Sequence, residues 1–155
     1  MDFIESRTRE IGAMALDGLY ERQKAISANT VNVLTPGYQR KTVSFEDSLR
    51  NIINRENEKE QIKMQNSIDY QINPKKVLQG QTPEQLAFLN SEVDEGFMIN
   101  VETDTSDAIG LDGNNVNLEE EMMDEAQTGM KYQVLSNLLS KNYSLLGQII
   151  KGQNS

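Results

Sequence analysis

Cysteine and histidine are both missing from this sequence, and it contains no long apolar run. Without cysteine there is no disulfide framework and no thiolate nucleophile. Without histidine the chain lacks the usual general base near neutral pH and the commonest zinc ligand. No stretch approaches the ~18 consecutive apolar residues of a transmembrane helix. Charged residues interrupt the start of the chain, so we also expect no cleavable secretory signal.

Positive charge is missing from one long stretch. Residues 84–125 carry thirteen acidic residues and no lysine or arginine, and the whole chain of 155 residues has a net charge of -9. Because phosphate groups bind to basic faces, this distribution speaks against nucleic acid and against an anionic membrane surface as partners. Only 37% of the residues are hydrophobic, which suffices for one modest domain but not for a large compact core.

A long amphipathic helix is predicted from Phe3 to about Leu34. Apolar or small residues recur there at helical, nearly heptad spacing, and the segment Thr35-Pro36-Gly37 then ends the helix. A helix of roughly thirty residues is about 45 Å long, more than a small domain covers by itself. Its apolar stripe therefore needs a partner. The stripe consists of Ile11, Gly12, Ala15, Leu16, Leu19, Ile26 and Val33.

A second long helix is predicted between Leu118 and Ile150, where the chain has no proline. Asn117 is a plausible N-cap, and the three glutamates that follow Leu118 complement the helix dipole. The simplest fold class is mainly α. The two terminal helices pair as an antiparallel coiled-coil hairpin, and the partly irregular middle segment has room for short β-structure.

The middle segment begins with a short extended piece around Val43, followed by a short helix capped by Ser44 or Asp47. Residues 54–82 are polar and are predicted to be a partly ordered linker. Thr82 and Pro83 then mark the start of another short helix.

Residues 97–101 are a strand candidate, and residues 102–112 form an acidic loop. The resulting organisation has three parts. Residues 1–38 and 113–155 form the core of paired helices, and residues 39–112 form the loop-rich middle.

No catalytic or metal-binding pattern stands out. The paired carboxylates are interpreted as a solvated acidic face and as charges at helix N-termini, because acid–base catalysis needs a desolvated carboxylate in a pocket. They are Asp94, Glu95, Glu119, Glu120, Glu121, Asp124 and Glu125. Residues 104–114 lack the spacing of a calcium loop. We therefore expect neither an enzyme nor a cofactor.

The end of the first helix carries a more specific pattern. Residues 27–38 resemble the S-x-N-x-A-N-x-x-T-P-G-Y signature of flagellar rod, hook and hook-associated axial proteins. Valine replaces the usual alanine at Val31, and Val33-Leu34 replaces another common pair, so the chain resembles a divergent member. The matching positions are Asn29, Asn32, Thr35, Pro36, Gly37 and Tyr38.

Further segments resemble the proximal rod proteins, the FlgB type of this family. Residues 41–49 are similar to the segment that follows the motif, and residues 111–122 are similar to the start of the C-terminal helix. The second segment contributes the motif positions Asp112, Gly113, Asn114 and Asn115.

The resemblance implies a structural role in the flagellar basal body. The chain is expected to be a subunit of the periplasmic rod, exported through the flagellar type III apparatus without a cleavable signal. Implied partners are copies of itself, other rod proteins and the rod-to-MS-ring adaptor, with no nucleic acid and no membrane insertion. Two alternatives remain: another rod protein of the family, or a non-polymerising soluble helical adaptor.

Assembly is expected to occur through the apolar stripes of the two terminal helices. These helices are predicted to be largely disordered in the free monomer and to fold when they dock between neighbours. The expected packing residues are Leu16, Leu19, Ile26, Val33, Leu135, Leu139, Leu146 and Ile150.

Overall fold

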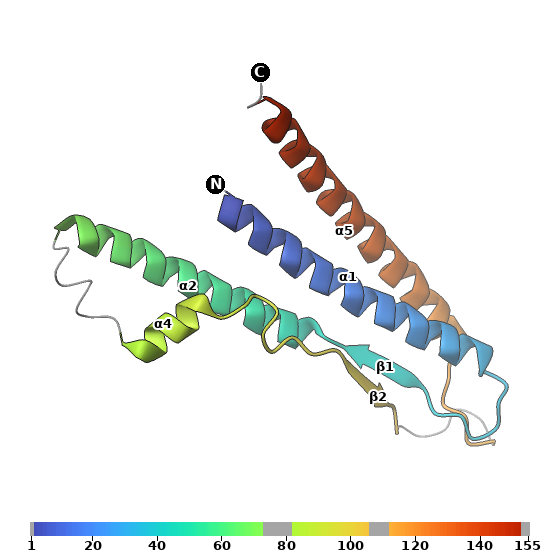
Figure 1. Cartoon of the computed structure of the whole chain (residues 1–155). Coiled ribbons are helices and arrows are strands. Elements are labelled where there is room, and N and C mark those ends of the chain that lie inside the picture. Colours follow the sequence, from blue (N-terminus) through green and yellow to red (C-terminus); the bar gives the residue numbers. More distant parts are fainter. Residues whose placement is uncertain (1, 73–81, 106–111, 153–155) are drawn as a thin grey trace.

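The computed structural model in Figure 1 describes the backbone of residues 2–72, 82–105 and 112–152, and the side chains of residues 7–72, 82–105 and 112–148. This part of the chain is mainly helical, which confirms the predicted class. Its elements are α1 (Asp2–Val31), β1 (Lys41–Ser44), α2 (Glu46–Ile72), α4 (Pro83–Asn90), β2 (Asn100–Thr103) and α5 (Leu118–Gly152).

Helix α1 is the central element. Figure 1 shows α5 on one side of it and α2 on the other, and both run antiparallel to α1. The contact with α5 extends along much of α1. Gln23 Nε2 donates to Glu125 Oε1 at 3.3 Å, Gly12 lies against Leu139, and the Arg9 guanidinium lies 5.6 Å from the centre of the Tyr143 ring. The two predicted terminal helices are therefore present and in contact.

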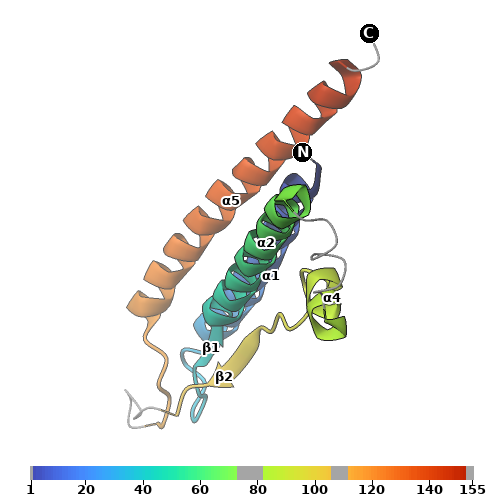
Figure 2. The ribbon, with the colours of Figure 1, turned by 90° about the vertical axis from the view of Figure 1, so that its left-hand side faces the viewer.

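The main apolar cluster lies where the strands meet α1. The strands β1 and β2 pair antiparallel, with Val43 opposite Val101. Figure 2, turned by 90°, shows this two-stranded sheet close to the base of α1. The buried cluster consists of Leu19, Ala25, Val43 and Phe45, with Leu49, Phe97, Ile99 and Leu135 packed around it. This sheet fixes the direction of the chain as it leaves the predicted turn.

The linker predicted over residues 54–82 is wrong for residues 54–72, which belong to α2. A polar helix forms there because its charged groups have partners. Arg7 of α1 donates to the Glu56 carbonyl at 3.0 Å and pairs with Glu60 at 2.8 Å. Lys59 Nζ pairs with Glu56 at 2.6 Å and donates to the Ser91 carbonyl at 2.8 Å. Hydrophobic periodicity alone misses such a helix. The remainder of the predicted linker lies outside the described residues.

Two helix starts are as predicted, and one is not. Thr82 and Gln85 form a reciprocal capping box at α4, and Asn117 Oδ1 accepts the Glu119 N–H at 3.0 Å at α5. At α2 the first helical bond runs from the Leu49 N–H to the Phe45 carbonyl, so neither Ser44 nor Asp47 is the N-cap.

Two boundaries are shifted from their predicted positions. Helix α1 ends at Val31 and not near Leu34, because residues 32–34 already form the turn. The strand predicted at residues 97–101 lies at Asn100–Thr103, since its position is set by pairing with β1. Two residues of the predicted acidic loop are therefore part of β2.

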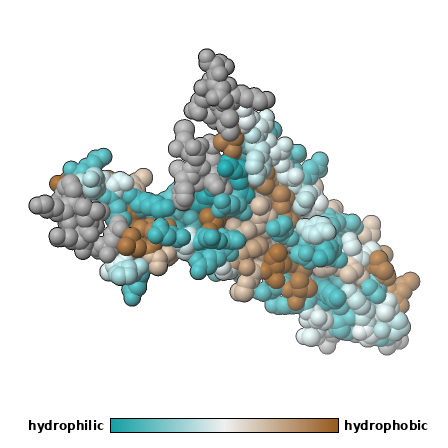
Figure 3. Space-filling model, in the orientation of Figure 1, coloured by the Kyte–Doolittle hydropathy of each residue, from teal (hydrophilic) through white to brown (hydrophobic). Residues whose placement is uncertain are grey.

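Part of the apolar surface of α5 has no partner within the described chain. Figure 3 shows apolar patches between polar ones over the helices. The exposed apolar residues at helical spacing on α5 are Met123, Met130, Val134, Leu138 and Leu145. The only fully buried side chains on the described part of α5 are polar ones, Glu121 and Thr128. No helix in the described ranges combines the length and apolarity needed to cross a bilayer.

Candidate functional site: the junction of the two motif segments

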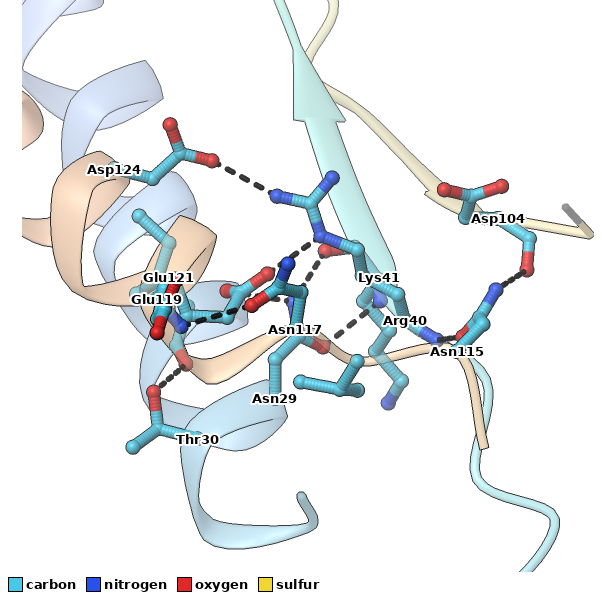
Figure 4. A network of polar contacts seen from close by, with 12 residues as sticks. Asn29, Thr30, Arg40, Lys41, Asp104, Asn115, Asn117, Glu119, Glu121 and Asp124 are labelled. Atoms are coloured by element: carbon cyan, nitrogen blue, oxygen red, sulfur yellow. Dashed lines mark hydrogen bonds and ion pairs between the residues drawn. The ribbon is translucent and has the colours of Figure 1, made fainter. Parts of the chain in front are cut away.

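Asn29 lies at the centre of a buried polar junction between α1, β1 and α5 (Figure 4). Its side chain is 1% exposed. Its Nδ2 group donates to the Lys41 carbonyl at 2.8 Å and to Glu121 Oε2 at 3.0 Å. Its Oδ1 atom accepts the Lys41 N–H at 2.8 Å and the Tyr38 hydroxyl at 3.2 Å. An asparagine amide offers two donors and two acceptor lone pairs, so all four are used.

Glu121 is the buried anion of this junction, and its side chain is 0% exposed. Besides Asn29, it binds the Arg40 Nε–H, while Arg40 Nη2 pairs with Asp124 Oδ2 at 2.8 Å. Burial lowers the pKa of Arg40, but the hydrogen bond to Glu121 and the charges of Glu121 and Asp124 outweigh burial and raise it. Arg40 therefore supplies a permanent positive charge opposite Glu121.

The solvated interpretation of the carboxylates is wrong for Glu121. Glu119 and Glu120, its neighbours in the first turn, are exposed as expected. Glu121 differs because it faces α1 in the same heptad position as Thr128 and Leu135. This spacing was a signal that could have identified it. Arg40 had no signal of this kind, because it lies between the motif and β1.

Asn114 joins the second motif segment to the end of α1. Its Nδ2 group lies 2.9 Å from the carbonyl oxygens of Asn32 and Thr35 and 3.1 Å from that of Val33. Its Oδ1 atom accepts the Val116 N–H at 2.7 Å. These three carbonyls belong to the turn that follows α1, and Asn114 binds them from a distant part of the chain.

The Asn115 side chain adds one hydrogen-bonded bridge at the end of the two-stranded sheet. Its Oδ1 atom accepts the Arg40 N–H at 2.6 Å, and its Nδ2 group donates to the Asp104 carbonyl at 2.9 Å. The side-chain amide thus bridges two backbone groups just beyond the paired residues of β1 and β2. Neighbouring motif asparagines therefore have separate structural roles: Asn114 holds the turn after α1, and Asn115 bridges the ends of β1 and β2.

The turn residues of both motif segments also meet. Gly37 has φ +70° and Gly113 has φ +81°, a region that glycine adopts at little cost. The Gly37 N–H donates to the Asp112 carbonyl at 2.9 Å. Thr35 Oγ1 donates to Asn32 Oδ1 at 3.1 Å, and exposed Pro36 lies in the bend that the bond from the Tyr38 N–H to the Thr35 carbonyl closes at 3.2 Å.

The predicted packing residues are buried to different extents. Leu19 and Ile26 are fully buried, and Gly12 brings the α1 backbone directly against half-buried Leu139. The side chain of Ile150 lies outside the described residues. Four further predicted packing residues are half-buried: Leu16, Val33, Leu135 and Leu146.

We expect Asn114→Ala to lower the free energy of unfolding by about 1–2 kcal/mol, because three carbonyls of the turn after α1 lose this donor. Urea denaturation monitored by circular dichroism measures this change. Asn137→Ala, an exposed position on α5, is the matched control and should stay within about 0.5 kcal/mol of the parent. Equal effects of the two substitutions would contradict the role of Asn114 in holding the turn.

The pKa of Tyr38 is raised above its ordinary value of 10.0, first by burial and second by the negative charge of Glu121. The fold therefore favours the neutral phenol. Its contribution to stability is complete below the unfolded pKa and is lost as pH rises through the folded pKa. From about pH 8 to about pH 11 the parent should lose more unfolding free energy than Tyr38→Phe, as urea titrations would measure. Parallel pH profiles of the two proteins would contradict this assignment.

No metal-binding cluster of three or more histidine, cysteine or acidic residues occurs in the ranges that the structure describes. Residues 106–111, part of the stretch that lacks the spacing of a calcium loop, lie outside those ranges. The arrangement at the junction is one of saturated hydrogen bonds and paired charges, which suits fixing two chain segments together. Comparison with known proteins gives no family: no protein-family model and no curated protein matches this sequence.

Proposed function

We propose that this chain is a structural subunit of the bacterial flagellar rod, of the proximal type. In this proposal it lies in the periplasmic part of the basal body and contacts copies of itself, other rod proteins and the rod-to-MS-ring adaptor. One observation carries the proposal. The two segments that resemble the axial proteins are far apart in the sequence, yet they meet in one buried network through Asn29, Asn114 and Glu121. The two segments that carry the resemblance therefore belong to one structural unit.

The surface of α5 supports an assembling role. Its exposed stripe of Met123, Met130, Val134, Leu138 and Leu145 flanks the face that contacts α1. Open helical assemblies need two different contact surfaces on each subunit, and this exposed stripe can supply one of them. In the assembled rod, α1 and α5 would close along their length into an antiparallel coiled-coil hairpin.

Coupled folding and assembly is part of the proposal. The face of α5 toward α1 has half-buried leucines and fully buried polar groups. This combination favours a free monomer of low stability. Amide hydrogen exchange should show residues 3–34 and 118–150 folded but only weakly protected in the monomer, and strongly protected in purified basal bodies. A non-polymerising adaptor would instead protect both helices in the monomer and be missing from basal bodies.

Gly37→Val is expected to impair rod assembly, because a β-branched residue is strained at φ +70°. No atom lies within 4 Å of the added Cβ, so the effect comes from the backbone and not from a clash. Swimming in soft agar and electron microscopy of basal bodies from the host strain measure the outcome. Full motility with normal rods would count against this role of the turn. Gly129→Ala, at an open position on α5, is the control.

A further inference from the structure

The outer edge of β1, which faces away from β2, is occupied by side chains of α1. The Asn29 amide binds both the N–H and the carbonyl of Lys41, as a neighbouring strand would. Arg22 donates to the Val43 carbonyl from Nε at 3.2 Å and from Nη2 at 2.8 Å. Three of the four backbone groups that Lys41 and Val43 direct to this side are therefore already bound.

The outer edge of β2 is different. Lys41 is opposite Thr103 and Val43 is opposite Val101, so these four residues share the alternation of an antiparallel ladder. Since Lys41 and Val43 direct their backbone groups away from β2, Val101 and Thr103 direct theirs away from β1. The bond from the Asp104 N–H to the Arg40 carbonyl at 2.7 Å fits the same alternation.

These outward groups have no partner among the residues that the structure describes. Neither the N–H nor the carbonyl of Val101 or Thr103 has a recorded hydrogen bond there. All four residues of β2 are exposed, and the Val101 side chain is 57% exposed. Figures 1 and 2 show β1 on one side of β2 and no helix or strand on its other side. An exposed edge of this kind is a template for pairing with another chain.

Charge identifies the kind of partner. Glu102 is the only charged residue of β2, Asp104 follows it, and residues 84–125 contain no lysine or arginine. Antiparallel pairing of two copies through Val101 and Thr103 would place the two Glu102 side chains opposite or diagonal to each other, which is unfavourable. A strand with a basic residue opposite Glu102 and an apolar one beside Val101 would be favourable.

We propose that the outer edge of β2 binds an extended, basic segment of a partner protein as a third strand. The backbone groups of Val101 and Thr103 form its ladder, and Glu102 selects its charge. Val101 lies on the same sheet face as buried Val43. An apolar residue of the partner beside Val101 adds to the apolar side chains on this face. This site is independent of the terminal helices and does not depend on the rod assignment.

The test uses the full chain and a blocked synthetic peptide of about six alternating lysine and valine residues. Binding is followed by NMR, with amide exchange read at each residue. The expected result is binding at up to ~1 mM peptide, with exchange at Val101 and Thr103 slowed by about tenfold. Failure to bind, or binding without protection of these two amides, would overturn the proposal.

Two controls separate strand addition from simple charge attraction. A fully N-methylated lysine–valine peptide keeps its charge but cannot donate backbone hydrogen bonds, and its binding should be lost. Glu102→Lys should weaken binding of the parent peptide by about fivefold or more and permit binding of a glutamate–valine peptide. Glu84→Lys on α4 makes the same change in net charge away from β2 and should leave binding unchanged. Equal effects of the two substitutions, or retained binding of the N-methylated peptide, would contradict the proposal.

Discussion

Replacing Glu121 with alanine should lower the free energy of unfolding by about 3 kcal/mol, because the change leaves Arg40 and Asn29 without their buried anion. Removing one member of a buried ion pair costs more than the pair contributes, since the remaining charge stays desolvated. The expected effect is at the lower end of the usual range because the Arg40 side chain is 19% exposed and keeps Asp124. Equilibrium urea unfolding provides the measurement.

Glu120→Ala is the matched control for this prediction. Glu120 is adjacent in the sequence but exposed, so its removal should change stability by less than about 0.5 kcal/mol. Glu121→Gln preserves the shape of the side chain and should recover part of the loss. If Glu121→Ala and Glu120→Ala unfold at the same urea concentration, the buried pair contributes nothing to stability.

The second large effect is expected at Gly18, where α1 meets the ring of Phe45. A Cβ at this position would lie 2.5 Å from Phe45 Cδ2, and the ring itself is buried. Because neither the helix nor the aromatic ring can easily move, Gly18→Ala should lower the unfolding free energy by about 2 kcal/mol, despite the higher helix propensity of alanine.

Gly129→Ala makes the same chemical change on α5 in open space. Alanine is the better helix former, so this variant should gain about 0.5–1 kcal/mol of stability. The two substitutions are expected to change the unfolding free energy in opposite directions. Comparing them separates the effect of the Phe45 contact from the effect of helix propensity. Combining Gly18→Ala with Phe45→Leu should cost less than the sum of the single changes, and strict additivity would exclude a clash between the two side chains.

The two terminal helices could be predicted from the sequence because their signals are local. Periodicity defined α1 and α5, and side-chain caps at Thr82 and Asn117 defined two helix starts. The motif positions are also evident from the sequence alone. The structure adds their chemistry: Asn29 binds the backbone of Lys41 as a neighbouring strand would, and Asn114 holds the turn after α1 from a distant part of the chain.

The missed features depend on distant partners. Helix α2 has a polar sequence that resembles a linker, and the ion pairs that hold it involve Arg7. The burial of Glu121 depends on Arg40, which carries no motif signal. The exact position of β2 follows from its register with β1. Each of these features arises from a contact between residues that local sequence patterns do not connect.

The residues of the junction lie far apart in the sequence, so they become available for contact in a fixed order during synthesis. Asn29 and Glu121 are 92 positions apart, so a chain that emerges from its N-terminus presents Asn29 well before its buried anion. At typical synthesis rates the interval is roughly 5 to 20 seconds, long compared with the folding of a helix. During this time Asn29 and Arg40 remain without Glu121 of α5. The junction can therefore be completed only after the start of α5 has been synthesised.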